Sequence, residues 1–437
     1  MDESKRSFLR TALFGAGYLG LRSLATGIPM GILAKARTAR ADTPPVCGAK
    51  PQYLILATSG SGDPLNANVP GCYDDPGVYH PVDPTMTPTA MTFGSRTAMA
   101  ALPWTTLPPE IRARTTFFHH GTYTNAHGDA PKVNRLMGAV KRQEMLVSFI
   151  AKQNASCLTT VQVQPAVLSR TLITYQGAVM ATLSPPNLQA VLTSPTGAFA
   201  QLQQIRDNDV NKLNELFKST GNTAQRAILD QYALSQTEAR SLGQQLLADL
   251  AQIKGTTRAD QNIAAAVLLK MNVTPAVVVN YSFGGDNHGD TGLAGEARET
   301  VASCTAIADL YTRLTTYGLQ DQVTIAFQNV FGRTLKIDSH SGNADGRNHN
   351  ANHHCSVFIG SGFRSALIGG VALNKNANDY RATGIDSATG LASDSGDIAY
   401  EATLGSAGKT LAKACGVDPA AIDDQITSGS AIQAALA

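Results

Sequence analysis

Five short apolar runs constrain the fold of this chain more than any other feature, because polar loops and helical sequence alternate with them. They lie at residues 53–57, 115–119, 276–281, 323–328 and 356–359. Short apolar runs bounded by turn residues are typical of strands that are buried on both faces of a parallel sheet. Such strands, each followed by helical sequence, predict an α/β fold with a mainly parallel central sheet flanked by helices.

Polar loops rich in Asp, Asn and His adjoin these runs. Asp63 follows the first run in "SGSGDPLN", and Asp286 and His288 follow the third in "GGDNHGD". Functional groups of α/β folds gather at the carboxyl ends of the strands, so we expect these loops to meet in one site. Each aspartate could ligate a divalent cation, although each could equally serve as a turn or helix-capping residue.

The segment "GRNHNANHHC", residues 346–355, contains His349, His353 and His354, and His340 lies upstream. Neutral imidazole is the commonest metal ligand type, so we interpret this segment as a ligand block. The spacing allows two ligands for one ion or one ligand for each of two ions. A structural zinc site and an incidental polar loop remain alternatives.

Candidate catalytic groups lie in two further segments. "HHGTYTNAHGDAP" places the hydroxyls of Thr122 and Thr124 ahead of an expected helix, where a nucleophile could work beside His127. "FGRT" places Arg333 at a strand end, where a guanidinium could clamp an oxyanion. Ordinary helix caps and a surface arginine are the structural alternatives.

Three segments are expected to lie outside the alternating pattern. Residues 186–270 carry apolar residues at helical spacing, which predicts two or three amphipathic helices inserted as a hairpin or cap. Residues 372–397 are rich in Asn, Asp, Gly and Ser and predict a loop, with room for a hairpin. Residues 400–415 predict the final helix.

The first 41 residues differ from the rest. "SKRSFLR" is basic, a weakly apolar Gly-rich stretch follows, and Ala39 and Ala41 form an A-x-A-like cleavage site. We interpret residues 1–41 as a signal peptide resembling a twin-arginine signal, with Lys5 in place of the first arginine. Arg22 and Pro29 interrupt the apolar stretch, so no stable membrane span is expected after cleavage, although the segment could stay attached as an anchor.

Charge and cysteine content narrow the class of protein. The whole chain has 35 basic and 33 acidic residues. Residues 1–41 hold seven of the basic and two of the acidic ones, so the remainder has 28 against 31, a net charge of −3. Nothing in this balance of charge suggests the basic face that nucleic-acid binding needs, so no nucleic-acid partner is expected. The six cysteines form no C-x-x-C, and their even number permits disulfides in a periplasmic or secreted protein.

Several of these motifs, in this order, resemble the exported family known as domain of unknown function 1501, of the alkaline-phosphatase and sulfatase-like superfamily. The matching blocks are D-x-L-N from Asp63 to Asn66, the segment from Ala126 to Ala130, D-x-H at 286–288, F-G-R-T with the 346–349 block, and D-x-x-T-G at 386–390. The resemblance spans residues 42–437. It implies an alkaline-phosphatase-like fold and one or two divalent metals held by Asp, His and Asn.

Carried over residue by residue, the ligand-like positions of the family fall on Asp63, Asp286, His288, Asn348 and His349, with His353 or His354 as the last ligand. Asn348 stands where the family pattern has Asp, which favours calcium or magnesium over a tight pair of zinc ions. Ala126 stands where related sequences have serine, which leaves Thr122 or Thr124 as the nucleophile.

Two functions are compatible with this pattern. The first is an exported metal-dependent hydrolase of a phosphate or sulfate ester, in a small molecule or a polymer, delivered by the twin-arginine export machinery. Its metal, Ca, Mg or Zn, would polarise the ester while Arg333 or His127 stabilises developing charge. The second is a non-catalytic periplasmic binding or assembly protein that keeps the fold, which the departures at Asn348 and Ala126 favour.

Overall fold

The computed structural model describes residue 47 and residues 50–160, 162–193, 212, 245–336, 346–374 and 378–437. The chain divides into two compact units, Pro44–Leu183 with Leu268–Ala437, and Met1–Thr43 with Ser184–Val267. The expected signal peptide, residues 1–41, lies outside the described residues, as does His340.

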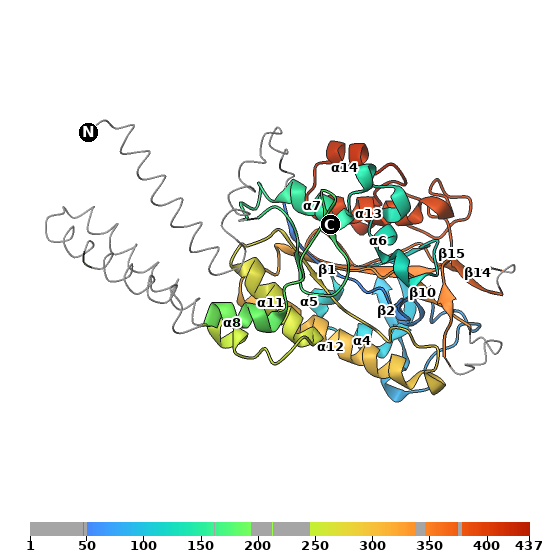
Figure 1. Ribbon diagram of the computed structural model, residues 1–437. Helices are drawn as coiled ribbons and strands as arrows, with labels where there is room; N and C mark the ends of the chain where they lie inside the picture. Colours follow the sequence, from blue (N-terminus) through green and yellow to red (C-terminus); the bar gives the residue numbers. More distant parts are fainter. Residues whose placement is uncertain are drawn as a thin grey trace. The chain divides into compact units, whose positions relative to one another are not determined.

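A seven-stranded sheet forms the centre of the first unit, in the order β13-β4-β12-β9-β1-β8-β5 (Figure 1). In chain order the strands are β1 (Tyr53–Ala57), β4 (Thr115–His120), β5 (Ala166–Val167), β8 (Ala276–Val279), β9 (Val323–Phe327), β12 (His354–Ile359) and β13 (Ala366–Ile368). The five strands expected from the apolar runs all lie in this sheet. The predicted α/β fold with a mainly parallel central sheet is therefore confirmed.

One strand runs against the others. β1 pairs in parallel with β8 and β9, β5 with β8, and β13 with β4, whereas β12 is antiparallel to both β4 and β9. The histidine-rich segment 346–353 therefore enters the sheet at the amino end of β12. Because β12 is reversed, that end lies at the same edge as the carboxyl ends of β1, β4, β8 and β9. The polar loops do meet at one edge of the sheet, as expected. The histidine-rich segment reaches that edge at the amino end of its strand, whereas the other loops reach it at the carboxyl ends of theirs.

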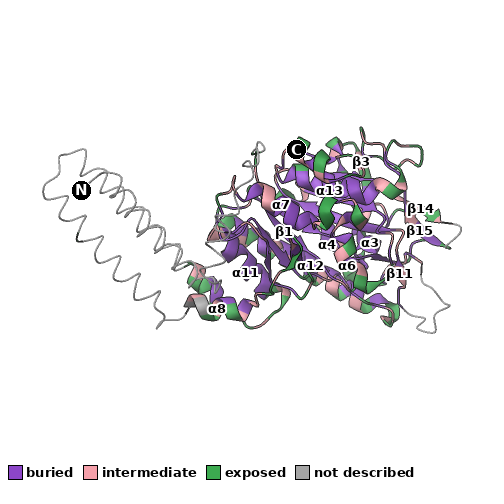
Figure 2. Ribbon diagram, turned by 45° about the horizontal axis from the view of Figure 1, so that its top comes forward, coloured by how far each residue is buried: buried purple, intermediate pink, exposed green. Residues whose placement is uncertain are grey.

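Helices cover both faces of the sheet (Figure 1). On one face, α7 (Leu146–Asn154) contacts β1 and β8, α13 (Thr403–Ala414) contacts β4, and Phe118 of β4 joins their apolar core. Phe117, the preceding residue, points to the other face, where its ring lies 5.3 Å from Trp104 of α4 (Leu102–Thr105). β1, α7 and α13 are drawn largely as buried in Figure 2. Burial on both faces explains the uninterrupted apolar runs in the sequence.

The remaining helices and several two-stranded ladders complete this unit. Its other helices are α3 (Leu65–Asn68), α5 (Pro109–Arg112), α6 (Ala130–Val133), α12 (Ala294–Thr316) and α14 (Pro419–Gln425). Its two-stranded ladders are β2 (Pro88–Phe93) with β3 (Arg96–Ala101), β6 (Thr174–Tyr175) with β7 (Ala178–Val179), β10 (Gly332–Arg333) with β11 (His349–Asn350), and β14 (Val371–Asn374) with β15 (Asp379–Ala382). β14 begins one residue before the loop expected at 372–397, and β15 lies within that loop. α13 matches the helix expected at 400–415, but this helix is not the final one, because α14 follows it.

The second unit contains the described part of the expected helical insertion. It includes α8 (Pro185–Thr193) and most of α11 (Arg258–Lys270). Gln189 of α8 donates hydrogen bonds to the carbonyl oxygens of Leu250 (2.8 Å) and Ile253 (3.2 Å). The carboxylate of Asp260 in α11 accepts from the backbone N–H groups of Lys254 (2.8 Å) and Thr257 (3.0 Å), which lie just before this helix. Residues 194–211 and 213–244 lie outside the described residues, so the number of helices expected over 186–270 stays a prediction.

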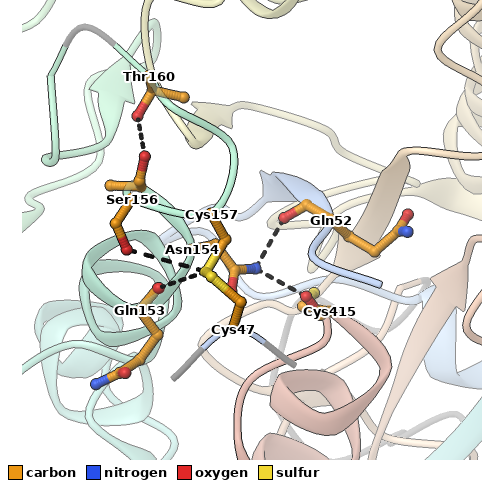
Figure 3. Close-up of a disulfide and its surroundings, with 9 residues drawn as sticks. Cys47, Gln52, Gln153, Asn154, Ser156, Cys157, Thr160 and Cys415 are labelled. Carbon is orange, nitrogen blue, oxygen red and sulfur yellow. Dashed lines mark hydrogen bonds between the residues drawn. A yellow bond between two sulfur atoms is a disulfide. The ribbon is translucent and has the colours of Figure 1, made fainter. Parts of the chain in front are cut away.

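A disulfide joins Cys47 to Cys157, just beyond the end of α7 (Figure 3). Beside it, the amide of Asn154 donates to the carbonyl oxygens of Gln52 (2.9 Å) and Cys415 (2.7 Å). This disulfide and this amide therefore tie the segment before β1 to two helices. The other four cysteines are reduced and buried. In the described part of the chain, we find no helix with the length and apolar character needed to cross a membrane.

Candidate metal centre

Three histidines and one carboxylate meet at the polar edge of the sheet. Nε2 of His288 lies 3.1 Å from Oδ1 of Asp286, Nε2 of His349 lies 3.8 Å from the same oxygen, and Nε2 of His127 lies 3.5 Å from Oδ2. The two nitrogens of His288 and His349 are 2.9 Å apart. We call His127, Asp286, His288 and His349 the histidine cluster. Asp286 and His127 are 47% and 43% exposed, so the cluster is open to solvent.

Three segments far apart in the sequence deliver these side chains. Asp286 and His288 follow β8, His127 follows β4, and His349 lies in β11. β11 pairs with β10, and this pairing sets His349 directly opposite Arg333. Gly332 is required in this ladder, because a Cβ there would lie 2.2 Å from the carbonyl oxygen of His353. The F-G-R-T motif and the 346–349 block are thus joined through the β10–β11 ladder.

The partner of each Nδ1 atom indicates which nitrogen of each ring carries a hydrogen. Nδ1 of His127 donates to the carbonyl oxygen of Gly60 (2.9 Å), and Nδ1 of His349 donates to that of Asn125 (2.6 Å). Nδ1 of His288 faces the amide oxygen of Asn348 at 3.1 Å. An oxygen of this kind only accepts, so each Nδ1 carries a hydrogen, and Nε2 is the nitrogen that each ring offers to the cluster.

Nε2 of His288 faces Nε2 of His349 and one oxygen of Asp286, and Nε2 of His127 faces the other oxygen of Asp286. Two nitrogen lone pairs 2.9 Å apart repel unless a proton or a metal ion lies between them, and the guanidinium of Arg333, 3.3 Å from Nε2 of His288, offsets part of that repulsion. Histidines that bind metals characteristically donate their other N–H to a carbonyl or carboxylate oxygen, as all three rings do here. Ligands of a tetrahedral ion at 2.0–2.1 Å are about 3.3 Å apart, and the four spacings given above are 2.9–3.8 Å. The ligand atoms of His127, Asp286 and His349 all lie within 4.8 Å of one another, and His288 adjoins this group through Asp286 and His349. The residues therefore fit a metal ion.

Arg333 supplies a fixed positive charge beside the cluster. Its side chain is fully buried, and Nη2 donates to Asp286 (2.6 Å) and to the carbonyl oxygen of Ser61 (2.6 Å). Nη1 lies 3.3 Å from Nε2 of His288. Partial burial acts to raise the pKa of Asp286, but the hydrogen bond and charge of Arg333 hold that pKa below its usual value. Burial, together with the charge of Arg333, lowers the pKa of His349 and keeps this ring neutral.

The structure also forms a second group that could hold a metal ion, the buried Cys72, His119 and His353. In this group a directional chain of hydrogen bonds is complete. Nδ2 of Asn66 donates to Nδ1 of His353 (3.0 Å), Nε2 of His353 to Nδ1 of His119 (2.9 Å), and Nε2 of His119 to the carbonyl oxygen of Pro70 (2.9 Å).

Every polar atom in this series of hydrogen bonds has a partner, so the buried group needs no added charge. The amide of Asn66 cannot be reversed, because it also pairs with both the N–H and the carbonyl oxygen of Arg333. Burial raises the pKa of the Cys72 thiol and lowers that of His119 to about 4, which favours the neutral form of both. Physical chemistry therefore favours the exposed histidine cluster over the buried group as a metal centre.

The remaining expected site residues lie elsewhere. Asp63 is fully buried and accepts from the backbone N–H groups of Leu65 (3.0 Å) and Phe283 (2.9 Å) and from the amide of Asn329 (2.9 Å). Burial raises the pKa of Asp63 to about 7. Nε2 of the buried His354 accepts from the N–H of Asn329 (3.1 Å). The structure does not bring Asp63, His353 or His354 into the histidine cluster.

Neither candidate nucleophile has a free hydroxyl. The hydroxyl of Thr122 is buried against the carbonyl oxygens of Thr124 and Ala351, both at 3.4 Å. The hydroxyl of Thr124 donates to Asp129 (2.7 Å). The D-x-x-T-G block forms a turn at the surface, in which Asp386 accepts from Thr389.

Sequence reasoning missed the groups that orient the cluster. Two are backbone carbonyls, of Gly60 and Asn125, which leave no signal in the side chains. The third is Phe331, whose ring stacks on His349 with centroids 4.4 Å apart. Its place in F-G-R-T, two residues before Arg333, was the available signal.

Comparison with known proteins adds little to this geometry. No family model matches the chain, and no curated protein matches it. Among solved structures, the PH0037 protein from Pyrococcus horikoshii is similar with a TM-score of 0.28 and 10% identity. The match covers 76% of this chain and 91% of that one. The resemblance to the domain of unknown function 1501 family stays an expectation.

Proposed function

We propose that this protein is an exported metal-dependent hydrolase of a phosphate or sulfate ester, with the histidine cluster as its metal centre. One observation carries the proposal: the ligand atoms of His127, Asp286 and His349 lie within 4.8 Å of one another, and His288 lies against two of these residues. Each Nδ1 of the three rings is directed at an oxygen acceptor, which leaves Nε2 toward the cluster. Three imidazoles and one carboxylate suit zinc or a similar transition ion, whereas calcium and magnesium take mostly oxygen ligands. Asn348 supports His288 in this arrangement and does not itself bind the ion.

A bound divalent ion would polarise the ester and lower the pKa of the attacking water. The other roles fall to side chains already in place. Arg333 is held by Ser61 and Asp286, and its Nη1 points to Nε2 of His288. Once that lone pair is engaged elsewhere, Nη1 is free to donate to an oxygen of the ester and stabilise its developing charge. Asp286 and His127 lie at the exposed side, where a small-molecule or polymer ester could enter.

Export is supported by two features. The basic segment before residue 42 resembles a twin-arginine signal, and the Cys47–Cys157 disulfide suits an oxidising compartment such as the periplasm. The alternative function, a non-catalytic periplasmic binding or assembly protein, is favoured by the engaged hydroxyls of Thr122 and Thr124 and by Ala126.

One experiment distinguishes these functions. The mature protein is purified, its metal content is measured, and aryl phosphate, phosphodiester and aryl sulfate substrates are tested after loading with zinc, manganese, magnesium or calcium. We expect zinc binding and turnover, both lost in His288→Ala and retained in His80→Phe, which removes a histidine stacked on Tyr73. Metal binding without turnover would support the binding protein. Turnover unaffected by His288→Ala would exclude the histidine cluster as the catalytic site.

A further inference from the structure

The two loops that carry His288 and His349 are in direct contact behind the histidine cluster. The N–H of Arg347 donates to the carbonyl oxygen of Asn287 (3.3 Å). Gly346 packs so closely on the other loop that a Cβ would lie 1.9 Å from the carbonyl oxygen of Asn287 and 2.4 Å from that of His288. The spacing of the two ligands is therefore set by the residues beside them.

A buried ion pair joins these loops to a helix. Nε of Arg347 donates to Oε2 of Glu296 in α12 (2.7 Å) and Nη2 to Oε1 (3.1 Å), and both side chains are fully buried. The same carboxylate accepts from the amide of Asn287 (2.9 Å) and from that of Asn68 (2.7 Å). Nη1 of Arg347 donates to the carbonyl oxygen of Thr334 (2.8 Å), the residue after Arg333 in F-G-R-T. One pair thus holds the residues adjacent to His288, Asn348 and Arg333.

We propose that Glu296 and Arg347 are a positioning pair, which sets the distance between His288 and His349 for binding a metal ion. The proposal rests on the proposed function, because it concerns the same centre. A buried ion pair is a weak source of stability, and apolar residues of similar volume often replace one without loss. Fixing the geometry of two ligand loops is a role that apolar residues would not fulfil.

The test compares a double variant with the wild-type protein. Glu296→Leu with Arg347→Met removes both charges together, so neither is left unpaired in the interior. Cobalt(II) is titrated into each mature protein, and its visible spectrum reports affinity and coordination geometry. We expect the double variant to unfold at a lower denaturant concentration, because the buried amides of Asn68 and Asn287 and the carbonyl oxygen of Thr334 lose their partners. Under conditions where it remains folded, it should bind cobalt roughly 10–100-fold more weakly. Arg347→Lys, which keeps the charge but loses the two-point contact, should bind with intermediate affinity.

Lys409→Met is the control, because it breaks an ion pair between α13 and α14, in which the Lys409 side chain is 11% exposed and that of Asp423 is 73% exposed. It should leave cobalt affinity unchanged. Wild-type cobalt affinity in the double variant would overturn the positioning role. If the wild-type protein binds no cobalt, the proposed function fails, and hydrogen exchange then tests the pair. Faster exchange confined to residues 286–290 and 346–350 in the double variant would support positioning, and unchanged exchange there would overturn it.

Discussion

Replacing Asn348 with aspartate should tighten metal binding at the histidine cluster by about tenfold or more. The amide oxygen of Asn348 lies 3.1 Å from Nδ1 of His288, and aspartate has nearly the same shape. The substitution therefore adds a negative charge without moving the ring. A carboxylate partner also makes the imidazole a more basic ligand.

The size of the effect follows from the geometry. The imidazole ring and a metal–nitrogen bond of about 2.0–2.1 Å place the ion roughly 6 Å from the new charge. At that distance, Coulomb's law with the dielectric constant of water gives about 1.4 kcal/mol for a unit charge and a divalent ion, which is tenfold in affinity. The side chain of His288 is only 30% exposed, so the effective dielectric constant is lower and tenfold is the minimum.

Competition with a chromophoric chelator measures zinc affinity at fixed pH and ionic strength. Asn374→Asp is the matched control, because it adds the same charge in the β14–β15 hairpin and should leave zinc affinity within about twofold of the wild type at physiological salt. Asn348→Ala, which removes the acceptor of Nδ1, should weaken binding about 10–100-fold. Equal zinc affinity for the wild type, Asn348→Asp and Asn348→Ala would refute the assignment of Asn348 as the support of a metal ligand.

Three further predictions concern other parts of the chain. Burial lowers the pKa of His120 to about 4, below the unfolded value of about 6.5. The free energy of unfolding should therefore fall by roughly 3 kcal/mol from this residue as the pH drops from 6.5 toward 4. Urea unfolding of His120→Phe across this range should show a shallower pH dependence than the wild type. Arg333→Lys should retain zinc but lower kcat about 10²–10³-fold on the best aryl ester, and an unchanged kcat would remove Arg333 from the mechanism. Cys47→Ser opens a disulfide that spans 110 residues, and should lower the free energy of unfolding by about 2–4 kcal/mol, whereas an equal stability with and without reductant would contradict this.

The sequence was sufficient to predict the strands because burial on both faces leaves a local signal. Val277, for example, lies in β8, whose four residues are all apolar and buried. The direction of β12 left no such signal. A run such as 354–359 looks the same in either direction, and its pairing is fixed only by where the chain enters the sheet. The histidine segment was therefore placed correctly at the edge of the sheet, but with the wrong strand direction.

Within the site, Asp286, His288, His349, His127 and Arg333 were all expected, and the structure brings them together. Their acidic, imidazole and guanidinium groups follow strand ends in the sequence, which is the pattern that led to them. Their orientation could not be predicted, because it depends on backbone carbonyls from loops that are distant in the sequence. The same limit applies to Glu296, which is one acidic residue among several on α12 until its buried contact with Arg347 is known.

The segment "NHHC" illustrates why a high local count of histidines is a poor guide to a metal site. Consecutive residues entering a strand point to opposite faces, so His353 and His354 cannot converge on one ion. His353 joins His119 in a hydrogen-bonded chain, and the ring of His354 lies edge-on to His120, with centroids 5.5 Å apart. His349, four residues earlier, lies in a different ladder and reaches the cluster alone. The histidine cluster differs because the Nε2 atoms of His288 and His349 face each other beside Asp286. This orientation follows from the oxygen atom to which Nδ1 of each ring is hydrogen-bonded.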